Sequence, residues 1–133
     1  MINLMKNKKY NFTKEKNKIL MSKQDVKKVL KCNQLIGLHS HSHSLNMNKL
    51  NYKKQLLDYK KNITFFKKNF KIVPKSMSHP YGRYNNSSIR VLKKIGIKLG
   101  FLSSFTKGKI FSSLEVPRYD HIYMINKFSK NKL

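Results

Sequence analysis

The sequence predicts an α/β fold with a largely parallel sheet and crossover helices. Two observations predict it. Segments with helical spacing of apolar residues alternate with short apolar runs along the 133 residues, and the order is helix, strand, helix, strand, helix, strand, strand. Such alternation is typical of parallel strands that are connected by helices. At this length the chain forms at most one domain, which is large enough to bury a core.

The first two helices are predicted from caps and from periodicity. The segment 21–31, "MSKQDVKKVLK", begins with Ser22 and Asp25 at the spacing of a capping box. The segment 49–70 is the clearest helix, because its apolar side chains recur every three or four residues with Lys between them. These side chains, which we expect to pack against the sheet, are Leu56, Tyr59, Ile63, Phe66 and Phe70.

A third helix is expected to begin with Ser87 or Ser88 as its cap and to end at Gly96. Its inner face would consist of Ile89, Leu92 and Ile95. The predicted strands are "QLIGL" (34–38), buried and ending at His39; "KSMSH" (75–79), stopped by "PYG"; "IKLGFLSS" (97–104); and "GKIFSSLEVPRYDH" (108–121), broken at Pro117.

The composition is strongly basic, with a formal charge of +25 at pH 7. Of the 30 basic residues 27 are Lys, spread along the chain, and only three are Arg, the residue that makes bidentate contacts to phosphate and guanine. Lys, Asn and Ile all have A/T-rich codons, so we attribute most of this charge to codon bias. We therefore expect no specific nucleic-acid partner, and no recognisable nucleic-acid-binding motif is present.

Cysteine usage and hydropathy bear on the kinds of cross-link, membrane span and cellular compartment that we expect. Cys32 is the single cysteine, which excludes an internal disulfide and the paired-cysteine zinc patterns. No apolar run approaches the roughly 20 residues of a membrane span. The N-terminal stretch lacks the apolar core of a signal peptide, so we expect a cytoplasmic protein. Residues 1–18 are basic and are expected to be loosely ordered, and the domain is expected to comprise 19–133.

A histidine cluster follows the first predicted strand, in "LIGLHSHSHSLN" (35–46). His39 and His43 are four residues apart, which on a helical turn places two imidazoles on one side, able to share a metal ion. His41 would point elsewhere. The alternative is a polar loop without ligands, the usual meaning of an isolated pair with this spacing.

A second polar cluster, "SHPYGRYN", follows the next predicted strand. Pro80 restricts φ and Gly82 permits positive φ, so the backbone can turn sharply and present free amides to a ligand. The alternative is an ordinary tight turn. Because functional groups in such folds lie at the C-terminal ends of the strands, we expect both clusters on the same rim of the sheet.

In this order, with an amphipathic helix between them, "IGLHSHSH" and "SHPYGRYN" resemble the polysaccharide deacetylase family, which has the NodB-homology domain. The resemblance covers roughly residues 20–120. It implies a partial (β/α) barrel and hydrolysis of an N- or O-acetyl group on a carbohydrate, with an acetylated glycan as the partner. It also implies that His39 and His43 bind a divalent metal, usually zinc, and that the backbone N–H of Tyr81 donates to the oxyanion.

The chain departs from the family pattern in several places. The family's N-terminal Asp-Asp motif, which supplies the base and a third metal ligand, is absent. Upstream of His39 the chain offers only Glu15 and Asp25, and Asp25 is better explained as a helix cap. Ser78 stands where the family has an Arg.

The late motifs of the family are also absent from the sequence. Asp120 and His121, in "LEVPRYDH", are candidate catalytic substitutes or part of a surface turn. His79 is a further candidate for the acid, as a spare imidazole on the rim.

Three functions therefore remain open. The first is a metal-dependent carbohydrate deacetylase, present here as a C-terminal part whose missing carboxylates a separate chain could carry. Such a part alone is expected to bind zinc weakly and to be inactive or nearly so. The second is a catalytically inactive relic of the same fold. The third is a basic nucleic-acid-binding protein, which only the Lys content supports.

Overall fold

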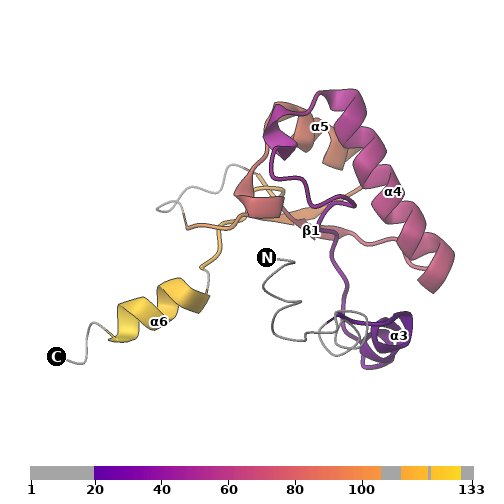
Figure 1. The fold of residues 1–133 in the computed structure, drawn as a ribbon, viewed down its shortest axis with the longest axis horizontal. Coiled ribbons are helices and arrows are strands. Elements are labelled where there is room, and N and C mark those ends of the chain that lie inside the picture. The colour runs from indigo at the N-terminus through magenta and orange to yellow at the C-terminus, as the bar shows by residue number, and fades with distance from the viewer. Residues whose placement is uncertain (1–19, 106–111, 120, 130–133) are drawn as a thin grey trace, which may run out of the picture. The chain divides into compact units, whose positions relative to one another are not determined.

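The structure is a computed structural model that describes residues 20–105, 112–119 and 121–129 (Figure 1). The chain divides into two compact units, Met1–Leu35 and Ile36–Leu133, which we describe separately. The predicted domain boundary at residue 18 lies outside the described residues.

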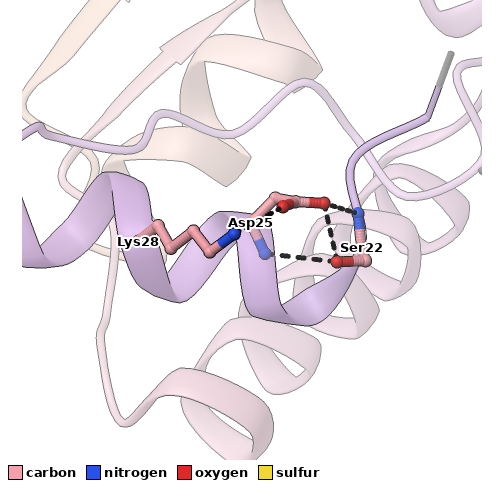
Figure 2. A network of polar contacts seen from close by, with 3 residues as sticks. All are labelled: Ser22, Asp25 and Lys28. Atoms are coloured by element: carbon pink, nitrogen blue, oxygen red, sulfur yellow. Dashed lines mark hydrogen bonds and ion pairs between the residues drawn. The ribbon is translucent and has the colours of Figure 1, made fainter. Parts of the chain in front are cut away.

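The described part of the first unit contains helix α3, Lys23–Lys31. Figure 2 shows the capping box at its start: the Asp25 amide donates to Ser22 Oγ over 3.2 Å, and the Ser22 amide donates to Asp25 Oδ2 over 3.0 Å. Lys28 Nζ lies 3.8 Å from the other carboxylate oxygen. The Ser22 hydrogen bonds, with a smaller contribution from Lys28, hold the pKa of Asp25 below its usual value. The predicted helix and its cap are confirmed, and Asp25 is occupied in capping.

The second unit is built on short parallel strands. Strand β1, Ser76–Ser78, pairs with β2, Leu99–Phe101, with Met77 opposite Gly100. Single parallel bridges extend the sheet on both sides: Leu38 pairs with Met77, and Val116 pairs with Phe101. Four chain segments thus run parallel in the order Leu38, β1, β2, Val116, which confirms the mixed α/β fold with parallel strands.

The first predicted strand is much shorter than expected. Over 34–38 only Leu38 pairs with β1: its amide donates to the Ser76 carbonyl oxygen over 2.8 Å, and its carbonyl accepts from Ser78 over 2.9 Å. Leu35 is 95% exposed. The prediction of a buried strand is therefore wrong for most of this segment, since the described residues place no strand beside its other edge.

Two helices carry the crossover connections, and they lie against each other in Figure 1. Helix α4, Tyr52–Phe70, is capped by Asn51, and helix α5 spans Asn86–Lys94. The N-cap of α5 is Asn85, which precedes both expected caps, Ser87 and Ser88. Ser88 completes a capping box as the third helical residue. Gly96, with φ of +80°, follows the helix end as expected. Short 3₁₀ turns, η1 at Met47–Lys49 and η2 at Pro80–Gly82, precede α4 and follow β1.

The core lies between the sheet and these helices. Its buried apolar side chains are Leu38, Met47, Tyr59, Met77, Val91, Leu92, Ile97 and Leu114. Four of the five predicted stripe residues of α4 pack here: Tyr59 is fully buried, and Leu56, Ile63 and Phe66 are partly buried against the cluster. Phe70 lies outside this cluster, with its ring against that of Phe66. Burial of this stripe, rather than intrinsic propensity, stabilises the long Lys-rich helix.

The C-terminal region differs most from expectation. Of the predicted strand 108–121, residues 108–111 and Asp120 lie outside the described residues, and Val116 forms one bridge. Helix α6, His121–Ser129, was not predicted. None of the helices in the described ranges is long and apolar enough to cross a membrane.

Candidate metal centre

His39 and His43 come together at the end of the Leu38 segment. Their Nε2 atoms lie 3.1 Å apart, and their ring centroids are separated by 4.8 Å. His39 Nδ1 lies 2.8 Å from the Ser78 carbonyl oxygen, which can only accept, so Nδ1 carries the hydrogen and Nε2 presents its lone pair. The two Nε2 atoms thus face each other, as the four-residue spacing predicts, and their role as metal ligands stays a prediction.

This arrangement offers two nitrogen ligands to a divalent cation. In tetrahedral zinc sites with Zn–N bonds near 2.1 Å, two ligand nitrogens lie about 3.4 Å apart, close to the 3.1 Å found here. Metal-binding histidines usually donate their other ring N–H to a carbonyl or carboxylate, as His39 does to Ser78. Two imidazoles are fewer than the three protein ligands of a catalytic zinc site. Among the described residues, no group of three or more His, Cys, Asp or Glu side chains is placed to hold a metal.

The loop that carries the pair is tightly constrained. Ser40 and His43 both have positive φ, +59° and +49°. The His43 amide donates to Ser40 Oγ over 2.9 Å. Asp58 of α4 accepts from the amides of His41 and Ser42, at 2.8 and 3.1 Å. His41 therefore contributes its backbone here, and the sequence reasoning missed Asp58, whose one signal is that it is the only acid in a Lys-rich helix.

The Pro80–Gly82 turn lies beside the histidine pair. The Tyr81 ring is 4.7 Å from the His43 ring, between centroids, and is half-exposed. Tyr81 and Gly82 both adopt left-handed φ, +54° and +65°, and a side chain at Gly82 would overlap the Ser103 hydroxyl. The expectation that the two clusters share one rim is confirmed for the Pro80–Gly82 turn.

His79 does not lie on that rim. Its side chain is 1% exposed, Nε2 donates to the Leu114 carbonyl oxygen over 2.9 Å, and the ring stacks on Tyr84 at 4.4 Å between centroids. Burial lowers the pKa of His79, against smaller opposing effects of the Leu114 hydrogen bond and of Glu115. The expected rim position is therefore wrong for this ring, which the preceding strand turns into the core. Its role as an acid stays a prediction.

Glu115 is occupied by two hydroxyl groups. Glu115 accepts from Tyr84 Oη at 2.9 Å and from Ser112 Oγ at 2.6 Å, so it braces the segment that covers His79. Burial, followed by Glu115, raises the pKa of Tyr84. Glu15 and Asp120 lie outside the described residues. His121 is the exposed first residue of α6, and its catalytic role, like that of Asp120, stays a prediction.

Solved structures share this fold. One is the deacetylase PplD from Streptococcus pyogenes, solved in complex with acetate. It matches with a TM-score of 0.66 and 17% sequence identity, and the match covers 74% of this chain and 44% of the PplD chain. IcaB from Ammonifex degensii matches with a TM-score of 0.66 and 15% sequence identity, over 75% of this chain and 47% of the IcaB chain. The BpsB deacetylase domain from Bordetella bronchiseptica matches with a TM-score of 0.62 and 13% sequence identity, over 76% of this chain and 50% of the BpsB chain. The chain thus matches about half the length of each of these structures.

The sequence comparisons address the family directly. A comparison with curated protein sequences found no significant match. The sequence model of the polysaccharide deacetylase family matches residues 3–100, which include both histidine-bearing motifs. This match covers well over half of the 133 residues. Together with the parallel-stranded α/β fold, it shows that the chain belongs to the polysaccharide deacetylase family.

Proposed function

We propose that this chain carries part of the active site of a metal-dependent deacetylase that acts on N- or O-acetylated carbohydrates. The observation that carries the proposal is the convergence of His39 and His43, whose Nε2 atoms lie 3.1 Å apart while Ser78 holds the other nitrogen of His39. Family membership supplies the reaction class. A polar loop without ligands would not need one imidazole locked in a single tautomer with its lone pair facing the other.

In this proposal His39 and His43 hold a divalent cation, with zinc as the first choice for imidazole ligands. Such a cation polarises a carbonyl and lowers the pKa of bound water. The Tyr81 ring borders the site beside His43, and its backbone N–H is the proposed donor to the acetyl oxygen as negative charge develops there. An acetylated sugar would reach the pair from the exposed side, since both imidazoles are solvent-accessible.

A carboxylate is still needed as base and further ligand. Asp58, Asp25 and Glu115 are occupied by loop amides, the α3 cap and the Tyr84–Ser112 contacts. We propose that the missing carboxylate comes from outside the described residues. Asp120 is the candidate within this chain, and a separate polypeptide with an Asp-Asp motif is the alternative source.

Acetate release from N-acetylated chito-oligosaccharides, with and without added zinc, tests the proposal. We expect the chain alone to release acetate barely or not at all, because loss of a general base alone costs roughly a hundred- to ten-thousand-fold. Addition of a segment with an Asp-Asp motif from a related deacetylase should restore zinc-dependent release, and His39→Ala should abolish it. His41→Ala is the matched control and should retain it.

Two results would alter the proposal. Restored release that survives both His39→Ala and His43→Ala would overturn the role of the pair. Robust zinc-dependent release by the chain alone would place the base within it, and Asp120→Asn should then abolish that activity.

A further inference from the structure

Asp58 connects helix α4 to the histidine loop. Its two carboxylate oxygens accept from consecutive backbone amides: Oδ2 from His41 at 2.8 Å and Oδ1 from Ser42 at 3.1 Å. Both bonds join residues 16 or 17 positions apart. Charge-assisted bonds of this kind are stronger than bonds between neutral groups. Within the described residues the carboxylate makes these bonds and no ion pair, although lysines surround it along the helix.

The loop requires such support. Ser40 and His43 lie in the left-handed region, which side chains larger than hydrogen disfavour. At the start of the loop, His39 is held by the Ser78 carbonyl, and the His43 amide is held by Ser40 Oγ. The two amides that Asp58 binds lie in between, at the top of the turn. With them released, the turn would lose both described hydrogen bonds to α4, and the local bond between the His43 amide and Ser40 Oγ would remain.

The helix backbone at Asp58 is held against the core. Its neighbour Tyr59 is fully buried in the core, so the backbone that carries Asp58 belongs to the packed part of α4. The carboxylate therefore transmits the position of the packed helix to the exposed loop. This arrangement matches the outer-shell partners of metal sites, which orient the ligands without touching the ion.

We propose that Asp58 is a positioning residue that sets the separation of His39 Nε2 and His43 Nε2 and thereby the metal affinity of the site. The inference rests on the proposed function for its metal, but the ring positions can be measured without metal. Asp58 touches neither the cation nor the substrate, and its effect passes through the amides of His41 and Ser42.

The test compares the full chain with Asp58→Ala and Asp58→Asn, and with Asp25→Asn as the matched control. Asp25→Asn removes the same charge, but from the α3 capping box. Zinc affinity is measured by titration calorimetry. We expect Asp58→Ala to weaken zinc binding about ten- to a hundred-fold, the usual effect of removing an outer-shell partner. Asp58→Asn should also weaken zinc binding. The asparagine side chain has an NH₂ group in place of one carboxylate oxygen, and this donor would face a backbone N–H that is itself a donor. Asp25→Asn should bind within about two-fold of the original chain.

A second readout separates this inference from the proposed function. In metal-free protein, NMR cross-peaks between the His39 and His43 rings should be present in the original chain and in Asp25→Asn, and lost in folded Asp58→Asn and Asp58→Ala. If the original chain bound no zinc, the metal proposal would fail, and the ring contact would still decide the role of Asp58. Retention of the ring contact, or unchanged zinc affinity in a folded Asp58 variant, would overturn the inference.

Discussion

The Nδ1–H of His39 donates to the Ser78 carbonyl oxygen over 2.8 Å, which ties the residue after the Leu38 bridge to the last residue of β1. The orientation of the His39 ring therefore depends on the position of β1. The bond fixes the ring orientation and the tautomer, and it leaves Nε2 free to face His43. It explains how a loop with an exposed end can hold an imidazole in a defined direction.

The three histidines of this loop should differ sharply in zinc binding. We expect His39→Ala and His43→Ala each to lower zinc affinity at least about ten-fold, because each removes one of two converging nitrogens. His41→Ala should change it less than about two-fold, since the loop uses the His41 amide. Titration calorimetry of the three purified variants provides the measurement. An equal effect of all three substitutions would contradict the assignment.

Stability should fall as the pH drops below the ordinary histidine range, in part because of His79. Burial holds the pKa of His79 below the usual histidine value of about 6.5. Below about pH 6.5 the unfolded chain therefore takes up a proton that the folded chain does not, and the free energy of unfolding decreases by at most about 1.4 kcal/mol per pH unit. At higher pH this contribution is fully present.

His79→Gln isolates that contribution, because glutamine can still donate to the Leu114 carbonyl but does not titrate. Urea unfolding of both proteins between pH 5 and 7.5 should show a flatter profile for the variant. The other four histidines are common to the two proteins and cancel in the difference. Identical profiles would mean that His79 ionises equally in the folded and unfolded chains.

Two glycines with positive φ should respond differently to alanine. Gly96→Ala should cost about 1 kcal/mol of unfolding free energy, since φ is +80° and the added methyl would meet only the end of the Lys75 side chain. Gly82→Ala has comparable backbone strain at +65°, and its methyl would also overlap the Ser103 side chain. We expect an additional loss of roughly 1–2 kcal/mol. Denaturant midpoints of the pair measure the difference, and equal losses would show that Ser103 moves aside freely.

Tyr59→Phe should stabilise the protein. The Tyr59 side chain is fully buried, and its hydroxyl finds no hydrogen-bond partner among the described residues. Burial, with a smaller effect of Asp58, raises the pKa of this hydroxyl. Removing an unsatisfied buried hydroxyl should raise the unfolding free energy by roughly 1 kcal/mol. Tyr59→Ala should lower it by several kcal/mol through the cavity it leaves, as a control for ring packing. A destabilised Tyr59→Phe variant would show that the hydroxyl has a partner.

Local patterns explain the parts of the fold that the sequence predicted well. The capping box of Ser22 and Asp25 and the stripe of α4 depend on residues within one or two helical turns, so their spacing is visible in the chain itself. The cap of α5 was misplaced because Asn85, Ser87 and Ser88 are all acceptable caps, and local propensity does not choose among them.

The pairing of strands was predicted in kind but not in extent. The alternation of segments indicated parallel pairing, whereas the length of each strand depends on neighbours that are far away in sequence. Met77 pairs with Gly100, and Leu35 stays exposed because the described residues offer it no second neighbour.

By itself, the sequence determined the candidate ligands, the order of the two motifs and the helices between them, since these follow from residue type and short-range spacing. Only the tertiary structure decided that His79 turns into the core, that Tyr81 flanks His43, and that Asp58 holds the loop amides. Each of these contacts joins residues at least 16 positions apart or depends on which side of a strand faces the helices. Such relations arise from the packing of α4 and β1 around a shared core, which short-range spacing in the chain does not encode.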